Sequence, residues 1–399
     1  MIRTVSQNPA ITSIHTADPS AHVWDDGKVY IYASHDMDPA RGCDLMDRYH
    51  VFSSEDMINW TDEGEILRSD DVSWGRPEGG FMWAPDAAYK NGVYYFYYPH
   101  PSGSNWNDTW KIGVATSKHP AKDFIDQGYI EGLGGFAMID PCVFADDDGK
   151  YYIYTGGGSR CEGAELSEDM MTLKGKSVEM LGLEDFHEAT WVFKRNGIYY
   201  LTYSDNLHGK NQMRYAISDS PLGPWEYKGI FLEPTGCDTS HGSVAEYKGQ
   251  YYLFYHNCDI SGVGNLRSVC IDCLYFNDDG TIQIVKQTKK DGVKSVGNAP
   301  DLSGMKKYEA DDGIFFNIDG GKGGRATVYI DYKTNEKLAK VNLIVNGSDW
   351  SLINLLGSDN CAYITVNLNA GANNTIRLTK PIKSTGEIKI NNIGVKLLD

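Results

Sequence analysis

The sequence is poor in cysteine, in long apolar runs and in clustered basic residues, and each shortage excludes a class of protein. Its eight cysteines are scattered over 399 residues. They are too sparse for a disulfide scaffold, and the single CxxC (Cys270 and Cys273) has no second pair to complete a zinc site. No run of 18 apolar residues is available to cross a bilayer. With a net charge of −17 and no Lys/Arg cluster, nucleic acid is not an expected partner.

The N-terminal segment MIRTVSQNPAITS has no apolar core of the kind found in secretory signals. Scattered cysteines that we expect to be buried and reduced point the same way. We therefore expect a cytoplasmic protein. If a signal peptide has been removed, the protein is instead secreted or periplasmic. The sequence leaves the oligomeric state open.

What the sequence has in abundance is aromatic residues, and they recur in one phrase. DDGKVYIYASHD, at residues 25–36, returns as NGVYYFYYPHP, DDGKYYIYTGGG, RNGIYYLTYSDN and YKGQYYLFYHNC. An Asp-Gly or Asn-Gly turn before an aromatic strand of period two is a strong hairpin signal, because such turns need a positive φ. The turn glycines are spaced by 65, 57, 48 and 52 residues. Three or four strands per repeat predict the blades of an all-β, five-bladed propeller over residues 1–296.

The pattern changes after residue 296. Residues 297–399 hold 7 of the 48 aromatic side chains. Short alternating runs such as ATVYIDY, AKVNLIVNG and AYITVNL, separated by Gly/Asn turns, predict a smaller β-sandwich. We therefore expect two domains, a propeller over 1–296 and a β-sandwich over 297–399.

Acidic residues stand at a fixed distance ahead of three of the turns. Asp18, Asp140 and Glu188 each lie nine residues before the turn glycine, and the two shorter repeats place Ala84 and His241 eight residues before it. In a propeller the first strand of each blade lines the central channel. One residue at the start of every such strand forms a ring at one end of the axis. We therefore predict that the three acids meet in one site, joined by His241.

Three carboxylates in one place repel each other, so at least one should keep its proton to high pH. Hydrolysis of a glycosidic bond requires this arrangement. One carboxylic acid protonates the leaving oxygen while a carboxylate acts on the other face of the sugar. A single acid would more often cap a turn or face solvent, whereas three in register favour a glycosidase site.

The repeats also resemble a known family, glycoside hydrolase family 43, whose members are five-bladed propellers. The resemblance covers nearly all of residues 8–285 and is carried by phrases that include ADPSAHVWDDGKVYIYASHD, MWAPDAAYKNGVYYFYYP, IDPCVFADDDGKYYIYTGG, HEATWVFKRNGIYYLTYS and HGSVAEYKGQYYLFYH, all in order. It implies inversion at the anomeric carbon, with Asp18 as general base, Glu188 as general acid and Asp140 as the carboxylate that orients the acid. Inversion requires a base–acid separation of roughly 6.5–9.5 Å.

Three further residues are candidates for the site. Trp83, in MWAPD, lies beside the ring of acids and could stack on a sugar face; a structural tryptophan is the alternative. The resemblance implies roles for the other two. Arg267 matches an arginine that contacts substrate and the third carboxylate; its alternative is a surface arginine at a strand end. His241 matches a substrate-side histidine that holds an axial calcium ion or water. One imidazole is a poor ligand for so hard a cation, so we expect no cofactor for the chemistry and at most a non-catalytic calcium ion.

The C-terminal segment, with KVNLIVNGSDWSLINLLG and VNLNAGANNTIRLT, resembles family 6 carbohydrate-binding modules. Trp350 and Tyr363 are its candidates for a sugar platform, and bracing of the propeller is an equally open role.

The resemblance favours an exo-glycosidase that removes terminal pentoses from plant oligo- or polysaccharides. An α-L-arabinofuranosidase is the first choice and a β-xylosidase the second. Two further alternatives are a sugar-binding propeller without catalysis and a retaining, fructan-type five-bladed hydrolase.

Overall fold

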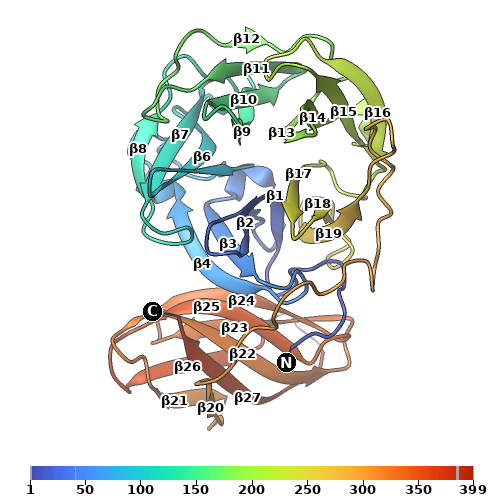
Figure 1. Ribbon diagram of the computed structural model, residues 1–399. Helices are drawn as coiled ribbons and strands as arrows, with labels where there is room; N and C mark the ends of the chain where they lie inside the picture. The colour runs from blue at the N-terminus through green and yellow to red at the C-terminus, as the bar shows by residue number, and fades with distance from the viewer. Residues whose placement is uncertain (1, 41, 312, 383–385, 399) are drawn as a thin grey trace.

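The computed structural model describes residues 2–40, 42–311, 313–382 and 386–398, and these residues form seven antiparallel sheets and four short 3₁₀ turns. Five sheets surround a central axis, and two further sheets pack beside them (Figure 1). None of the helical turns in the described ranges is long and apolar enough to span a membrane. The prediction of an all-β propeller followed by a β-sandwich is confirmed.

Each blade is a meander whose first strand lies nearest the axis (Figure 1). The first blade contains β1 (Thr16–Val23), β2 (Val29–His35), β3 (Arg48–Ser54) and β4 (Thr61–Arg68), and the second contains β5 (Asp86–Lys90), β6 (Val93–Pro101), β7 (Trp110–Ser117) and β8 (Ile125–Tyr129). The third contains β9 (Ile139–Ala145), β10 (Tyr151–Gly157), β11 (Arg160–Glu165) and β12 (Val178–Glu179). The fourth contains β13 (Glu188–Arg195), β14 (Ile198–Ser204), β15 (Met213–Ser218) and β16 (Glu226–Leu232), and the fifth β17 (Gly242–Tyr247), β18 (Gln250–Asn257) and β19 (Ser268–Leu274).

The predicted turns account for the inner hairpins. In the second blade Lys90 pairs with Val93, so Asn91 and Gly92 alone form the turn, with φ of 52° and 79°. Two consecutive residues at positive φ make the type I′ turn, whose twist matches that of the flanking strands. The fourth blade repeats this turn at Asn196 and Gly197.

Tyrosine hydroxyl groups join neighbouring blades, which gives the tyrosine-rich repeat a structural purpose. Tyr32 of β2 donates to the carbonyl of Pro120 in the second blade at 2.6 Å. Tyr97 of β6 donates likewise to Met170, which follows β11, at 2.9 Å. Equivalent bonds run from Tyr154 to Pro221 and from Tyr200 to Gly280. Each ring fills the space between two blades while its hydroxyl satisfies a loop carbonyl.

The N-terminal segment closes the ring from outside. The N–H of Ala10 donates to the carbonyl of Val269 in β19 at 2.7 Å, and the N–H of Ala21 in β1 donates to Ser243 Oγ in β17 at 3.0 Å. The first and fifth blades are therefore held together by both the entering chain and the inner strands.

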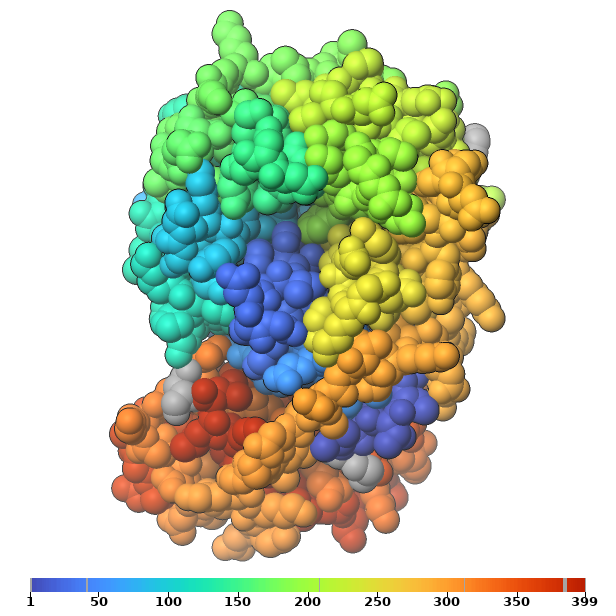
Figure 2. Space-filling model, in the orientation of Figure 1, coloured from blue at the N-terminus to red at the C-terminus, as the bar shows by residue number. Residues whose placement is uncertain are grey.

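The C-terminal part is a two-sheet sandwich. One sheet has the order β20 (Lys306–Tyr308), β27 (Ile388–Leu397), β22 (Gly324–Thr334) and β25 (Cys361–Leu368). The other has the order β21 (Ile314–Ile318), β26 (Asn374–Thr379), β23 (Leu338–Val345) and β24 (Asp349–Leu356). The predicted boundary at 296/297 lies in the segment between β19 and β20, which crosses the junction of the two parts in orange (Figure 2).

The sandwich packs on the first blade through specific hydrogen bonds. The N–H of Thr365 in β25 donates to Asp62 Oδ2 in β4 at 3.1 Å, and Arg325 Nη1 donates to the carbonyl of Glu63 at 2.7 Å. The N–H of Asn354 in β24 donates to the carbonyl of Ser13 at 2.8 Å. One hydrophobic cluster continues from the first and fifth blades into the sandwich. The C-terminal module thus braces the propeller.

Candidate active site

The three predicted acids line one pocket at an end of the propeller axis. Asp18 comes from β1, Asp140 from β9 and Glu188 from the first position of β13. All three line the same pocket of about 490 Å³, together with Trp83, Ala84, His241 and Arg267. The structure therefore brings together every residue that the sequence placed in the site, from all five blades.

A β-bulge in each of the three inner strands directs these side chains. The register of β1 shifts between Ala17 and Ser20, and equivalent shifts occur in β9 and β13. Asp18 and Asp140 lie in the bulges with φ of 52° and 53°. Aspartate tolerates this left-handed conformation better than most residues. Bulges re-aim a side chain at the cost of local pairing, which is what a convergent site requires.

The predicted equivalence of the three acids is wrong by one residue for Glu188. In β13 the positive φ, 67°, falls on Ala189, and Glu188 pairs with Ser204 just before the bulge. The equal distance of nine residues to the turn glycine did not reveal this offset, because the turns of the blades differ in length. Five residues separate the paired ends Val23 and Val29 in the first blade, whereas the turn of the fourth blade has two.

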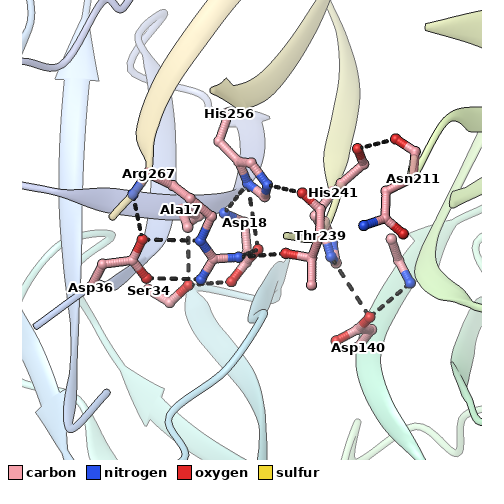
Figure 3. Close-up of polar contacts among 12 residues, drawn as sticks. Ala17, Asp18, Ser34, Asp36, Asp140, Asn211, Thr239, His241, His256 and Arg267 are labelled. Atoms are coloured by element: carbon pink, nitrogen blue, oxygen red, sulfur yellow. Dashed lines mark hydrogen bonds and ion pairs between the residues drawn. The ribbon is translucent and has the colours of Figure 1, made fainter. Parts of the chain in front are cut away.

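Asp18 is buried and is held by cationic and hydroxyl donors (Figure 3). Arg267 Nη1 donates to Asp18 Oδ1 at 2.9 Å, and Ser34 Oγ donates to Asp18 Oδ2 at 2.6 Å. Burial alone would raise the pKa of Asp18, but the Arg267 charge and the other donors outweigh it and leave that pKa below its ordinary value. Asp18 is therefore a carboxylate at neutral pH.

His256 supports Asp18 as a neutral ring. The backbone N–H of Asp18 donates to His256 Nδ1 at 3.1 Å, while His256 Nε2 lies 2.9 Å from the carbonyl of Thr239. These partners require the tautomer with hydrogen on Nε2. Burial lowers the pKa of His256 to about 3, so the ring adds no charge beside the carboxylate.

Asp140 and Glu188 form a second, proton-holding pair. Burial raises the pKa of both carboxyl groups, and the charge of Glu188 raises that of Asp140 further. The N–H of Ala189 donates to Asp140 Oδ2 at 2.7 Å. This bond lowers the pKa of Asp140 and so opposes part of the rise. The pair therefore holds one proton at a pH where Asp18 is ionised.

Two predicted contact residues lie beside these acids. Trp83 lines the pocket and donates its ring N–H to the carbonyl of Cys43 at 2.8 Å. Its ring packs in an aromatic cluster, with Trp110 at 4.7 Å and the partly exposed Trp106 at 5.8 Å between ring centroids. His241 is buried, with Nδ1 3.7 Å from Asp140 Oδ2 (Figure 3).

Asp36 is the main site residue that sequence reasoning missed. It is buried, and it accepts hydrogen bonds from Arg267 at three points, from the backbone N–H (2.7 Å), Nε (2.9 Å) and Nη2 (2.8 Å). Asp36 thus orients the guanidinium group that contacts Asp18 (Figure 3). The available signal was its position at the end of the first repeated phrase, ASHD, directly after the strand that pairs with β1.

The surroundings of His241 do not form a protein-built calcium site. In the described ranges no group of three or more His, Cys, Asp or Glu side chains is arranged to hold a metal ion. Calcium prefers six to eight oxygen ligands, whereas His241 brings one imidazole with Asp140 as its nearest carboxylate. The donor set does not fit a structural calcium, and we derive no step through one.

Comparison with known proteins agrees with this geometry. The family model "Glycosyl hydrolases family 43" matches residues 6–282. A xylosidase/arabinosidase 43A from Humicola insolens is 36% identical over 69% of this chain and 98% of its own. The structure is similar to that of a β-xylosidase/α-arabinofuranosidase from a compost metagenome, solved with xylotriose (TM-score 0.64, 35% identity, 71% of this chain and 98% of that one).

Another solved structure matches both parts of the chain. An arabinoxylan arabinofuranohydrolase from Bacillus subtilis covers 97% of this chain and 97% of its own, with a TM-score of 0.64 and 24% identity. At that identity the likeness bears on the fold alone. With the matched family model, the similar sequences and the three acids in one pocket, this chain belongs to glycosyl hydrolase family 43 and is a glycosidase that needs no cofactor for catalysis.

Proposed function

We propose that the enzyme is an inverting exo-glycosidase that removes terminal pentosyl residues, with Asp18 as base and Glu188 as acid. The observation that carries this proposal is the division of charge in the pocket. Asp18 is stabilised as a carboxylate by Arg267 and Ser34, while the Asp140–Glu188 pair retains a proton. Hydrolysis with inversion needs one group of each kind.

In this mechanism a water molecule attacks the anomeric carbon from the side of Asp18. Asp18 takes a proton from the water as the new C–O bond forms, and Glu188 gives its proton to the glycosidic oxygen as the old bond breaks. Asp140 is a positioning residue, because its negative charge favours a protonated Glu188. Arg267, held by Asp36, fixes the orientation of the Asp18 carboxylate.

The substrate is proposed from the relatives. Two relatives similar in sequence are named for xylosidase and arabinosidase activity, and we propose terminal α-L-arabinofuranosides first and β-D-xylosides second. Trp83 supplies an apolar wall on which a sugar ring can stack. His241 lines the same pocket and offers a ring nitrogen to a hydroxyl group.

The roles are tested by Asp18→Asn and Glu188→Gln, each nearly isosteric with the native residue. We expect each variant to lose at least about 10³-fold in kcat on nitrophenyl arabinofuranoside and xyloside, since each removes one proton-transfer group. Wild-type-like turnover by either variant would show that another residue performs that step. Activity on neither pentoside by the native enzyme, with activity on a hexofuranoside, would reject the proposed sugar class.

Two further proposals concern the setting of the enzyme. Activity should persist after treatment with EDTA, because no step passes through calcium; loss restored by Ca²⁺ would refute this. All eight cysteines are free thiols, which supports a cytoplasmic location. Detection of the protein in the culture medium of its host would contradict that location.

A further inference from the structure

A second cleft lies between the propeller and the sandwich. It encloses about 1080 Å³ together with its mouth, and its lining residues include members of β4, β24 and β25. These strands lie where the propeller and the sandwich meet (Figure 1). The walls of the cleft come from both parts of the chain and include His15, Asp38, Arg48, Glu65 and Trp350. Asp36, which binds Arg267 of the hydrolytic pocket, is also one of its lining residues. Among the described residues, none lines both this cleft and the pocket that holds Asp18.

The sandwich contributes an aromatic surface to this cleft. Trp350 in β24 is 54% exposed and lines the cleft beside Asp349 and Ser351. An indole left half in water costs hydrophobic free energy that burial against the propeller would have recovered. Such a ring, with polar groups around it, suits the apolar face of a sugar.

The propeller contributes buried polar atoms without partners. His15 is 2% exposed, and its Nε2 has no hydrogen-bond partner in the part of the chain that the structure describes; the nearest carboxylate oxygen, Asp38 Oδ2, is 4.0 Å away. His35 Nδ1 is also buried and without a partner among the described residues. Buried polar atoms are rarely left unpaired, so these nitrogens indicate a ligand or water that completes them.

The charge state of these two imidazoles limits the kinds of ligand group that they can bind. Burial lowers the pKa of His15 and of His35, so both are neutral near pH 7. A neutral imidazole presents one donor and one acceptor. A hydroxyl group can form a hydrogen bond with either ring nitrogen. An ionised phosphate or carboxylate only accepts hydrogen bonds, so it can pair only with the nitrogen that carries the hydrogen.

Most charged residues of the cleft are already paired. They include His50: burial alone would lower its pKa, but Asp62 and Glu65, which lie 3.5 and 3.7 Å from its ring nitrogens, raise that pKa to about 9. Arg48 Nη1 donates to Glu65 Oε1 at 2.6 Å, and Lys340 contacts Asp38. An incoming anion would meet the carboxylates of these pairs, while paired ions still accept and donate hydrogen bonds to neutral hydroxyl groups. The lining thus favours a neutral, polyhydroxylated ligand over an anion.

We infer that this interdomain cleft is a second saccharide-binding site, in which Trp350 stacks on a sugar ring and the imidazoles of His15 and His35 bind its hydroxyl groups. The ligand class is a short neutral oligosaccharide. This site is distinct from the hydrolytic pocket and lets the sandwich bind glycan jointly with the first blade. It does not depend on the catalytic roles proposed for Asp18 and Glu188.

The test is a calorimetric titration of xylotriose into the full chain carrying Glu188→Gln, which keeps the probe from being hydrolysed. We expect a binding component that Trp350→Ala weakens about tenfold or more and that Trp350→Phe retains, because the aromatic face is kept. Phe316→Ala is the matched control, since it removes an exposed aromatic residue of the same sandwich outside the cleft and should leave the isotherm unchanged.

Two results would overturn the inference. One is a xylotriose isotherm that is the same for the Glu188→Gln protein with and without the added Trp350→Ala substitution. The other is saturable binding of inorganic phosphate that depends on Trp350 while xylotriose does not bind there. Failure of the proposed function would appear elsewhere, as missing pentoside hydrolysis by the native enzyme, so the two failures are distinguishable.

Discussion

Replacement of Ser34 by alanine tests the charge state of the base directly. Ser34 Oγ donates to Asp18 Oδ2 at 2.6 Å, and both residues are buried. This bond stabilises the ionised form of Asp18 and helps to hold the pKa of Asp18 below its ordinary value. Ser34→Ala removes the donor and leaves the contact between Arg267 and Asp18 in place.

The size of the effect follows from the strength of the bond. A hydrogen bond to a charged group contributes about 1.5–3 kcal/mol, and one pKa unit corresponds to about 1.4 kcal/mol. Protonated Asp18 would keep part of this bond, so we expect the pKa of Asp18 to rise by about one unit in Ser34→Ala. The base must be ionised, and activity is lost as the pH falls through this pKa. The acid limb of kcat/KM should therefore move to higher pH by about one unit.

The assay is the initial rate of nitrophenyl pentoside hydrolysis as a function of pH, with enzyme kept at neutral pH until mixing. Ser53→Ala is the control, because Ser53 in β3 of the same blade donates to Glu63 Oε1 at an equal 2.6 Å outside the pocket. It should leave the acid limb in place. An acid limb that Ser34→Ala does not move, or moves to lower pH, would refute the assignment of Asp18 as base.

Three further substitutions have expected outcomes. Asp36→Asn removes one charge of a buried ion pair with Arg267, and should lower the free energy of unfolding by about 3 kcal/mol as well as kcat/KM; urea denaturation with native-like stability would contradict it. Asp140→Asn removes the negative charge that repels the ionised form of Glu188, so Glu188 should lose its proton at lower pH. The basic limb of the pH–rate profile should then move to lower pH. An unchanged basic limb would disprove the coupling between the two carboxyl groups. Trp83→Ala should raise KM about tenfold and leave both limbs in place, and an unaltered KM would make this tryptophan purely structural.

The sequence could predict the site because the repeat ties each acid to a turn. The spacing from the turn glycine located Asp18, Asp140 and Glu188, and the ring geometry of a propeller brought them together. The residues that control their protonation obey no such spacing. Ser34 lies beyond the turn on β2, Asp36 directly follows that strand, and His256 comes from the fifth blade. Their contacts therefore exist only after the ring closes.

The sequence could not predict the bulges or the interdomain cleft, and the reasons differ. Both a bulge and a longer turn add residues between an acid and the turn glycine. The number of residues between the two therefore could not show that Glu188 stands one position earlier, relative to its bulge, than Asp18 does. Trp350 was recognised as a candidate platform in the sandwich alone. The imidazoles of His15 and His35 that face the same cleft belong to the first blade, and only the docking of β24 and β25 on β4 brings the three together.

The stereochemistry of the first-formed product tests the central claim most directly. Proton NMR of a pentoside during early hydrolysis, before mutarotation, reports the anomer that is released. With Asp18 activating water across the sugar from Glu188, the released pentose should carry the anomeric configuration opposite to that of the substrate. Release of the same configuration would mean that a carboxylate attacks the sugar itself, and the assignment of base and acid would be wrong.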